Sequence, residues 1–137
     1  MTRVVIDASA GAELVARSLR GRRLRMLIPD DAEEWVPEHF YVEVLSFIRR
    51  RAVVEQLLTD SDAATQLQRL RSWPLRRASV EPLVEAAWSL RHNMSVADAL
   101  YVALADHLGA ALLTDDVRLV NSPAFPRSVH PLILERS

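Results

Sequence analysis

The chain has 137 residues, half of them hydrophobic, and a formal net charge of −1, which is typical of one soluble globular domain with a core of its own. It contains neither cysteine nor lysine, which excludes disulfides, thiolate metal sites, a cysteine nucleophile, the lysine of a P-loop and a Schiff-base enzyme. No segment approaches the roughly 20 apolar residues of a membrane span, and Asp7 comes too early for a signal peptide, so we expect a cytoplasmic protein that does not contact a membrane.

The first part of the chain alternates between predicted strands and helices. Residues 3–6 (RVVI) are a short β-branched run that indicates a buried strand. A helix is expected over 9–19, with Ser9 as a plausible N-cap. Residues 34–37 are a strand candidate, and 38–51 form a strong helical pattern whose arginines stand at the C-terminal end, where the helix dipole favours them.

The same alternation continues to the end of the chain. We expect helices over 53–58 and 61–72, broken around the letters TDSD; a strand over 76–80; helices over 81–93 and 95–109, the second closed by Gly109; and strands over 110–114 and 128–134. Strands separated by helices predict a single α/β domain over residues 1–137, with a mainly parallel central sheet covered by helices on both faces.

Two of the acidic positions directly follow predicted strands. Asp7 ends the first strand, and the pair Asp115–Asp116 follows the strand over 110–114. Ligand sites in open parallel sheets lie beyond the carboxyl ends of the strands, so these acids stand where functional groups are expected. The alternative is that Asp7 caps the next helix and that the pair caps whatever follows it.

Two further acids stand on apolar helical faces. Glu43 shares a stripe with Phe40 and Phe47, where a carboxylate is costly unless something pairs with it. Asp98 interrupts a segment that is apolar all round, the pattern of a buried helix. The alternatives are an edge position for Glu43, with its head group in solvent, and a capping box between Ser95 and Asp98.

The chemistry common to these acids is divalent cation binding. Clustered carboxylates cannot all stay ionised without a counter-charge, and the chain has no lysine to supply one. Oxygen ligands favour Mg²⁺ or Mn²⁺, and the lack of cysteine or paired histidine ligands argues against zinc. The four histidines show no ligand spacing and are expected to be surface or packing residues; they are His39, His92, His107 and His130.

All 17 basic residues are arginines, and many of them are clustered, in 17–25, 49–51 and 69–77. Arginine is the preferred side chain for phosphate recognition. Segregated arginines in a near-neutral chain could form a basic rim around an acidic centre. They could equally be solvated helix ends and loops.

Four segments of the chain together resemble the PIN-domain ribonucleases, and most closely the VapC-type toxins of bacterial toxin–antitoxin pairs. The segments are VVIDAS, PEHFYVEVLSFIRR, SVADALYVALA and LLTDDVRL, and they span nearly the whole chain in the family's order. The resemblance implies a three-layer α/β/α fold and a catalytic, metal-binding set of acids that comprises Asp7, Glu43, Asp98 and Asp116. In the last segment, a pattern like T-x-D-x-R-L selects Asp116 and leaves Asp115 as an accessory or bystander, beside Ser9 and Thr114 as supporting polar groups.

The resemblance also implies an activity and partners. One or two Mg²⁺ or Mn²⁺ ions would activate a water for in-line attack on an RNA phosphodiester, which leaves a 5′-phosphate and a 3′-hydroxyl. The RNA backbone would contact arginines near the cleft, for which the candidates are Arg20, Arg22, Arg23 and Arg118. A VapB-like antitoxin is expected to bind at the 9–19 helix and its neighbours or at the 17–25 stretch, and a homodimer is a family expectation. The arginine-dense 17–25 stretch and the PDDAEEW letters after it depart from the family pattern.

Two other functions remain open at this point, and two more lack a residue that they normally need. A housekeeping PIN-type RNA-processing nuclease would carry the same acids, and a non-catalytic α/β binding module would use them as caps. A haloacid-dehalogenase-like phosphatase normally has a second aspartate two positions after the first, where this chain has Ser9. A receiver domain relies on a lysine that this chain lacks.

Overall fold

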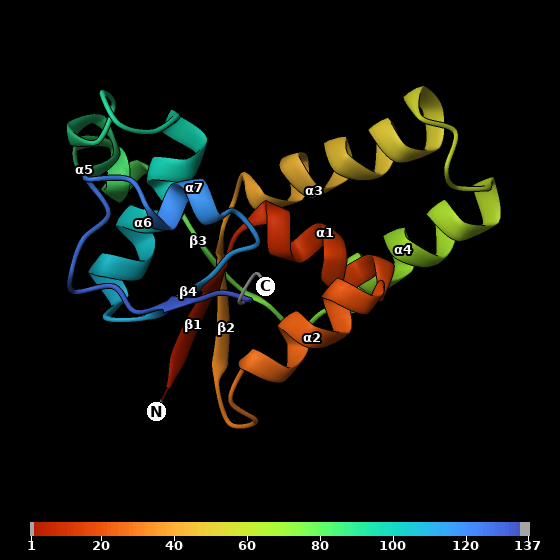
Figure 1. Ribbon diagram of the computed structural model, residues 1–137, viewed down its shortest axis with the longest axis horizontal. Helices are drawn as coiled ribbons and strands as arrows, with labels where there is room; N and C mark the ends of the chain where they lie inside the picture. The colour runs from red at the N-terminus through yellow and green to blue at the C-terminus, as the bar shows by residue number, and fades with distance from the viewer. Residues whose placement is uncertain (1, 135–137) are drawn as a thin grey trace.

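A parallel five-stranded sheet divides the molecule into two helical layers (Figure 1). The computed structural model describes residues 2–134. The strand order is β3-β2-β1-β4-β5, and every described pair of neighbours is parallel. The strands are β1 (Arg3–Ile6), β2 (Glu33–Pro37), β3 (Arg76–Ala78), β4 (Ala111–Leu113) and β5 (Pro131–Leu132). The predicted α/β class and its parallel sheet are confirmed.

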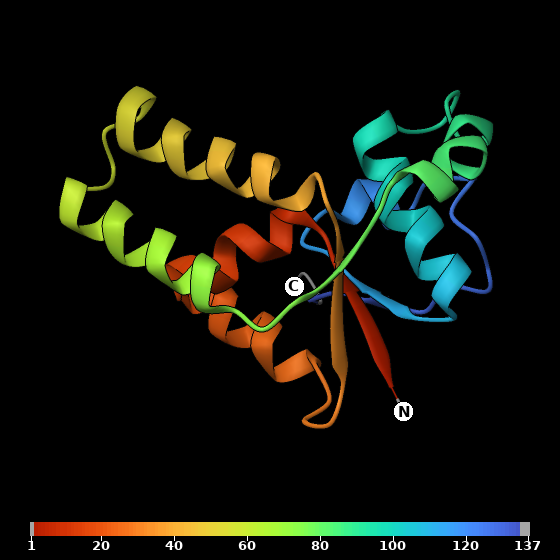
Figure 2. The ribbon, with the colours of Figure 1, turned by 180° about the vertical axis from the view of Figure 1, so that it is seen from behind.

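The helices cover both faces of the sheet. Helices α1 (Ala8–Ala16), α2 (Leu19–Leu27), α3 (Phe40–Arg49) and α4 (Asp60–Ser72) lie on one side, while α5 (Val84–Ser89) and α6 (Val96–Leu108) lie on the other, as the view from behind also shows (Figure 2). Short α7 (Val117–Val120) follows β4. No helix in residues 2–134 is both long and apolar enough to cross a bilayer.

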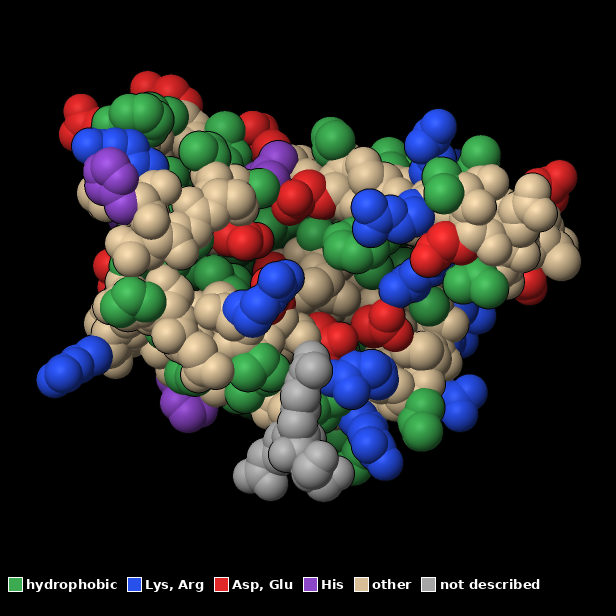
Figure 3. Space-filling model, turned by 45° about the horizontal axis from the view of Figure 1, so that its top comes forward, with side chains coloured by type: hydrophobic (Ala, Val, Ile, Leu, Met, Phe, Trp, Pro, Cys, Tyr) green, Lys and Arg blue, Asp and Glu red, His purple; other side chains and the backbone are tan. Residues whose placement is uncertain are grey.

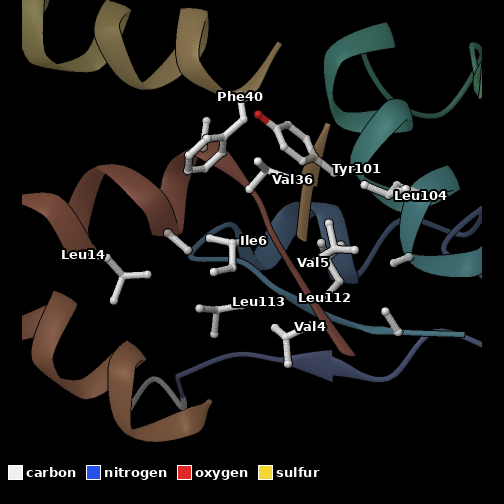
Figure 4. Packing of buried hydrophobic residues seen from close by; sticks show 14 of the residues in the cluster. Val4, Val5, Ile6, Leu14, Val36, Phe40, Tyr101, Leu104, Leu112 and Leu113 are labelled. Carbon is white, nitrogen blue, oxygen red and sulfur yellow. The ribbon is translucent and has the colours of Figure 1, made fainter. Parts of the chain in front are cut away.

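The core is centred on the two middle strands. Val4, Val5 and Ile6 of β1 and Leu112 and Leu113 of β4 are completely buried between the helical layers (Figure 4). Continuous apolar runs of this kind are expected where both faces of a parallel sheet are covered. The core therefore holds the carboxyl ends of β1 and β4 side by side.

The helix expected over 9–19 is present as α1 but ends earlier, at Ala16, and a second helix that was not predicted, α2, begins at Leu19. Asp7, and not Ser9, is the N-cap of α1, and its C-cap is Arg17, whose φ of 52° is left-handed. Ser18 then caps α2 by accepting a hydrogen bond from the backbone N–H of Gly21 at 3.0 Å. A Cβ on Gly21 would lie 2.1 Å from the carbonyl oxygen of Glu13, so only glycine lets α1 and α2 approach this closely.

The elements around the predicted TDSD break also differ from expectation. Helix α3 continues into a π-helical turn (Arg50–Val54), and the helix expected over 53–58 is absent from this described segment. The TDSD letters are instead the start of α4, where Thr59 and Asp62 form a capping box. The helix expected over 81–93 is shorter than predicted, with a 3₁₀ turn (Glu81–Leu83) before α5. Gly109 closes α6 in the left-handed conformation, as predicted.

Candidate active site

Asp7 occupies the end of β1 and is surrounded by hydrogen-bond donors. Because β1 and β4 pair in parallel, Asp7 lies beside Thr114, whose hydroxyl donates to Asp7 Oδ2. The hydroxyl of Ser9 and the backbone N–H of Ala10 both donate to Asp7 Oδ1, at 2.7 and 2.9 Å. The capping alternative for Asp7 is therefore confirmed, but it uses only one of the two carboxylate oxygens.

Burial makes Asp7 an unusual acid. It is 3 % exposed, and this burial raises the pKa of its carboxyl to about 6, although the hydrogen bonds from Ala10, Thr114 and Ser9 oppose the shift. The nearby charge of Asp98 adds to the rise. Asp7 therefore binds a proton more readily than an ordinary aspartate, and a cation near it would favour the ionised form.

Ser9 and Thr114 also hold the loop that follows β4. Each hydroxyl donates a hydrogen bond to Asp7 and also accepts one from the loop. Ser9 accepts from the backbone N–H of Asp115 and Thr114 from that of Asp116, each at 3.0 Å. Each hydroxyl thus links Asp7 to one member of the acidic pair. These contacts connect Ser9 and Thr114 to the acids, and their supporting role stays a prediction.

The two acids of the pair have different surroundings. Arg20 of α2 binds the Asp115 carboxylate in bidentate fashion, with Nε 3.1 Å from Oδ2 and Nη2 in contact with Oδ1. Asp116 caps α7 through one oxygen, Oδ1, which accepts the backbone N–H of Arg118 at 3.0 Å. Asp115 is thus neutralised within the chain, whereas Asp116 keeps Oδ2 free of hydrogen bonds among the described residues.

Asp98 stands at the first turn of α6 with its carboxylate half-buried. Ser95 caps the helix by accepting the Asp98 N–H at 3.1 Å, but no return bond from the Asp98 carboxylate to the Ser95 N–H occurs in the described part of the chain. Only half of the expected capping box forms, so capping does not explain the acid. Burial raises the pKa of Asp98, and the charges of Asp116 and Glu43 raise it further.

Glu43 points from α3 toward α6. Its Oε1 accepts a hydrogen bond from the Tyr101 hydroxyl at 2.7 Å and lies 3.5 Å from Nε2 of His39. The side chain is one-third exposed, so the predicted edge position is partly right, but a buried partner holds one oxygen. Its other oxygen, Oε2, has no hydrogen bond among residues 2–134.

Four acids from four elements thus face a common region at the carboxyl edge of the sheet. On the face shown in Figure 3, acidic side chains gather around a hollow, and arginines flank them. A hollow of about 400 Å³ next to the β4 loop is lined by Ser9, Phe47 and residues 115–118. The charge of Asp98 raises the pKa of Asp7, and the charges of Asp116 and Glu43 raise the pKa of Asp98, so Asp98 links the other three acids.

These acids do not form a ready-made metal cage. Within residues 2–134, no three carboxylate or imidazole side chains converge closely enough to hold an ion. The donor set nevertheless fits a hard divalent cation, because it consists of carboxylate oxygens, and Glu43 Oε2 and Asp116 Oδ2 have no hydrogen bond among the described residues. Like-charged carboxylates repel one another until a cation lies between them.

The predicted arginines divide between two places. Arg20 and Arg118 adjoin the acids, Arg20 through Asp115 and the largely exposed Arg118 at 3.6 Å from Asp116. Arg22 instead lines a separate cavity of about 650 Å³ between α1, α2 and α4, and Arg23 is exposed on α2. Of the four arginines predicted to surround the acids, Arg20 and Arg118 therefore lie beside them, and Arg22 and Arg23 do not.

Two neighbours of the acids escaped the sequence interpretation. In the sequence, Tyr101 was interpreted only as part of the apolar helix. Its hydrogen bond to Glu43 joins positions 58 residues apart, and a single sequence contains no signal for such a contact. His39 was expected to be a surface or packing residue. Its i,i+4 spacing to Glu43 was the available signal for this contact.

Comparisons with known proteins show which family and which relatives this chain resembles. A family model described as the PIN domain matches residues 4–123. The chain is similar to Ribonuclease VapC12 of Mycobacterium tuberculosis, with 40% identity over 128 residues covering 87% of this chain and 91% of that protein, and to Ribonuclease VapC3 of the same species, with 40% identity covering 87% and 86%.

Solved structures share the fold. VapBC2 from Rickettsia felis, bound to a DNA fragment from its promoter, superposes with a TM-score of 0.68 at 11% identity and covers 98% of this chain and 100% of that chain. VapC20 of Mycobacterium tuberculosis, described as a sarcin-ricin loop cleaving toxin, gives a TM-score of 0.65 at 23% identity and covers 93% and 99%.

The raised pKa of Asp7 predicts how stability depends on pH. The pKa of the Asp7 carboxyl is about 6 in the folded protein and 3.8 in the unfolded chain, so protonation of Asp7 stabilises the fold. This contribution to the free energy of unfolding is fully present below pH 3.8 and is lost as the pH rises through about 6. Relative to Asp7→Asn, the metal-free wild type should lose roughly 3 kcal/mol between pH 4 and pH 7.5, about two pKa units.

Urea denaturation in EDTA across this pH range measures the difference. Asp31→Asn, at an exposed position, is the control and should follow the wild-type curve. Parallel curves for the wild type and Asp7→Asn would contradict the buried, proton-binding role of Asp7.

Proposed function

The chain belongs to the PIN-domain family, among its VapC-type ribonucleases, and we propose that it is a metal-dependent endoribonuclease that acts as the toxin of a toxin–antitoxin pair. The proposed substrate is RNA of the translation machinery (tRNA, rRNA or mRNA), so that cleavage inhibits translation. The observation that carries this proposal is the approach of Asp7, Glu43, Asp98 and Asp116 at one edge of the sheet, from elements far apart in sequence.

The four acids would hold one or two Mg²⁺ or Mn²⁺ ions. When bound, such an ion supplies a water of lowered pKa and stabilises charge on the leaving oxygen of a phosphodiester. The chain itself provides the anchoring: Ser9 and Thr114 orient Asp7 and the loop after β4. Arg118 and the outer N–H groups of Arg20 lie where they can contact RNA phosphates without reading bases.

A VapB-like antitoxin has a suitable surface in the cavity between α1, α2 and α4. The floor is apolar, formed by Leu14, Val15 and Trp73, and arginines, including Arg17 and Arg69, surround it. This combination suits an amphipathic antitoxin segment with acidic side chains. The position agrees with the expected contribution of the 9–19 and 17–25 segments.

A homodimer is proposed as well. Apolar side chains are exposed on α3, α5 and the start of α6, namely Val42, Val84, Trp88 and Val96. Exposed apolar groups of this size favour association with another protein surface.

Metal-dependent cleavage should require Asp98. We expect the purified protein to cleave a structured RNA pool in Mg²⁺ or Mn²⁺, and EDTA to abolish cleavage. Asp98→Asn should lower kcat by about 100-fold or more, the rate equivalent of roughly 3 kcal/mol, because a free carboxylate of the site is lost. Gel analysis of the products measures both effects, and cleavage that survives EDTA or the substitution would sink the proposal.

The acidic pair should respond unequally to substitution. Asp116→Asn removes the acid with a free oxygen and should abolish cleavage. Asp115→Asn, an isosteric control one residue away, should retain kcat and raise the KM for RNA several-fold, because Arg20 loses its anchor. Steady-state kinetics on a short RNA separates the two, and the reverse pattern would show that Asp115 belongs to the metal site instead.

Charge reversal at the arginine-lined cavity should weaken antitoxin binding. Arg17→Glu places an acid at its rim and is expected to raise the Kd for a VapB-like antitoxin partner by about tenfold or more, through like-charge repulsion. Cleavage by the free toxin should persist. Calorimetric titration gives the Kd, and Arg127→Glu, an exposed arginine outside the cavity lining, is the control. Equal affinities for both variants would place the antitoxin elsewhere.

A further inference from the structure

Tyr101 carries a buried hydroxyl that contacts one of the four acids. The residue lies on α6 three positions after Asp98 and is 1 % exposed. Its ring reaches from α6 toward α3, and its oxygen stands at the far end of the ring, away from the core residues around β1 (Figure 4). A hydroxyl at this depth needs a partner, because an unpaired buried polar group is costly.

Glu43 supplies that partner. The Tyr101 hydroxyl donates to Glu43 Oε1 at 2.7 Å, a short bond to a charged acceptor. Burial raises the pKa of Tyr101, and the bond to Glu43 together with the charges of Glu43, Asp7 and Asp98 raise it further. A tyrosine phenol keeps its proton near neutral pH at its ordinary pKa, so the Tyr101 hydroxyl is the donor in this pair.

His39 holds the pair in place from the side. Its ring packs on the Tyr101 ring with centroids 4.7 Å apart, and its Nε2 donates to the carbonyl oxygen of Ala97 at 3.1 Å. This bond joins the start of α3, which carries Glu43, to the start of α6, which carries Asp98. The distance between the two acid-bearing helix ends is thus set by contacts behind the acids.

The consequence concerns the two oxygens of Glu43. Glu43 is partly exposed, and without a fixed partner its long side chain could turn toward solvent. With Oε1 bound to Tyr101, one oxygen of the carboxylate is occupied from the protein side, and Oε2 has no hydrogen bond among the described residues. Groups of this kind behind a metal-binding carboxylate fix its orientation.

We propose that Tyr101 is a positioning residue for the metal site, whose hydroxyl holds Glu43 so that Oε2 is presented to the divalent cation. The inference rests on the proposed function, since it takes Glu43 to be a metal-binding acid. In this inference, Tyr101 affects metal binding only by orienting the Glu43 carboxylate.

The test compares Tyr101→Phe with Tyr41→Phe. Phenylalanine keeps the ring that packs in the core and removes only the hydroxyl. Tyr41, the other tyrosine of the chain, stands two residues before Glu43 on α3, and no bond from its hydroxyl to the acids occurs among the described residues. Calorimetric titration of metal-depleted protein with Mn²⁺, in the absence of RNA, gives the Kd of the ion, and thermal denaturation reports folding.

We expect Tyr101→Phe to raise the Kd for Mn²⁺ by about 10- to 100-fold, the usual effect of losing a group that orients a ligand. At fixed, subsaturating Mn²⁺ the kcat for RNA cleavage should fall, with the KM for RNA unchanged and partial recovery at higher Mn²⁺. Tyr41→Phe should match the wild type. A Tyr101→Phe protein with a lower Tm and an unchanged Kd for Mn²⁺ would overturn the inference, because it would show a purely structural role.

A double substitution separates this inference from the proposed function. If Tyr101 acts through Glu43, Tyr101→Phe should have little further effect on Mn²⁺ affinity in a Glu43→Gln background, and additive effects would contradict the inference. An Mn²⁺ affinity that depends on both residues, in a protein without EDTA-sensitive RNA cleavage, would uphold the positioning role while refuting the proposed nuclease.

Discussion

The buried carboxylate of Asp7 is the constraint on which the rest of the site depends. A charge this deep in a protein persists only if donors surround it. Here the donors come from the start of α1 and from the end of β4, so that satisfying one acid also fixes the register of the two central strands and the loop after β4. Fold and site are therefore not separable at this edge of the sheet: the contacts that make the acid tolerable also bring Asp116 to it.

Charge within the site is distributed unevenly, and this follows from arginine placement. The adjacent carboxylates of Asp115 and Asp116 would repel each other, but Arg20 forms an ion pair with Asp115. Asp116 keeps its Oδ2 free of hydrogen bonds among the described residues. Arginines of a single helix are likewise divided between the acids and the separate cavity. Arg20 and Arg22 belong to the same short helix, yet one contacts the acids and the other lines the cavity against α4.

Local patterns predicted much of this structure, and contacts across the chain explain what they missed. The strands and the acids that follow them were visible because a buried parallel strand is a short apolar run and an acid at its end breaks that run. Helix α2 was missed because its four arginines hide the amphipathic pattern, although Ser18 and Gly21 carried capping and close-approach signals. The Tyr101–Glu43 bond and the Arg20–Asp115 pair had no such signal, since they depend on how helices far apart in sequence pack.

The pairing of β1 with β4 also has a consequence for the order of events during synthesis. Asp7 is made among the first residues, while Thr114, its hydrogen-bond partner, follows 107 residues later. Domains grow from the N-terminus on the ribosome, and contacts of such long range close last. A nascent chain that ends before β4 therefore has Asp7 with its donors from Ser9 and Ala10 but without Thr114, and it has no Asp116 at all. The acid cluster comes into being only when almost the whole polypeptide has left the ribosome that made it.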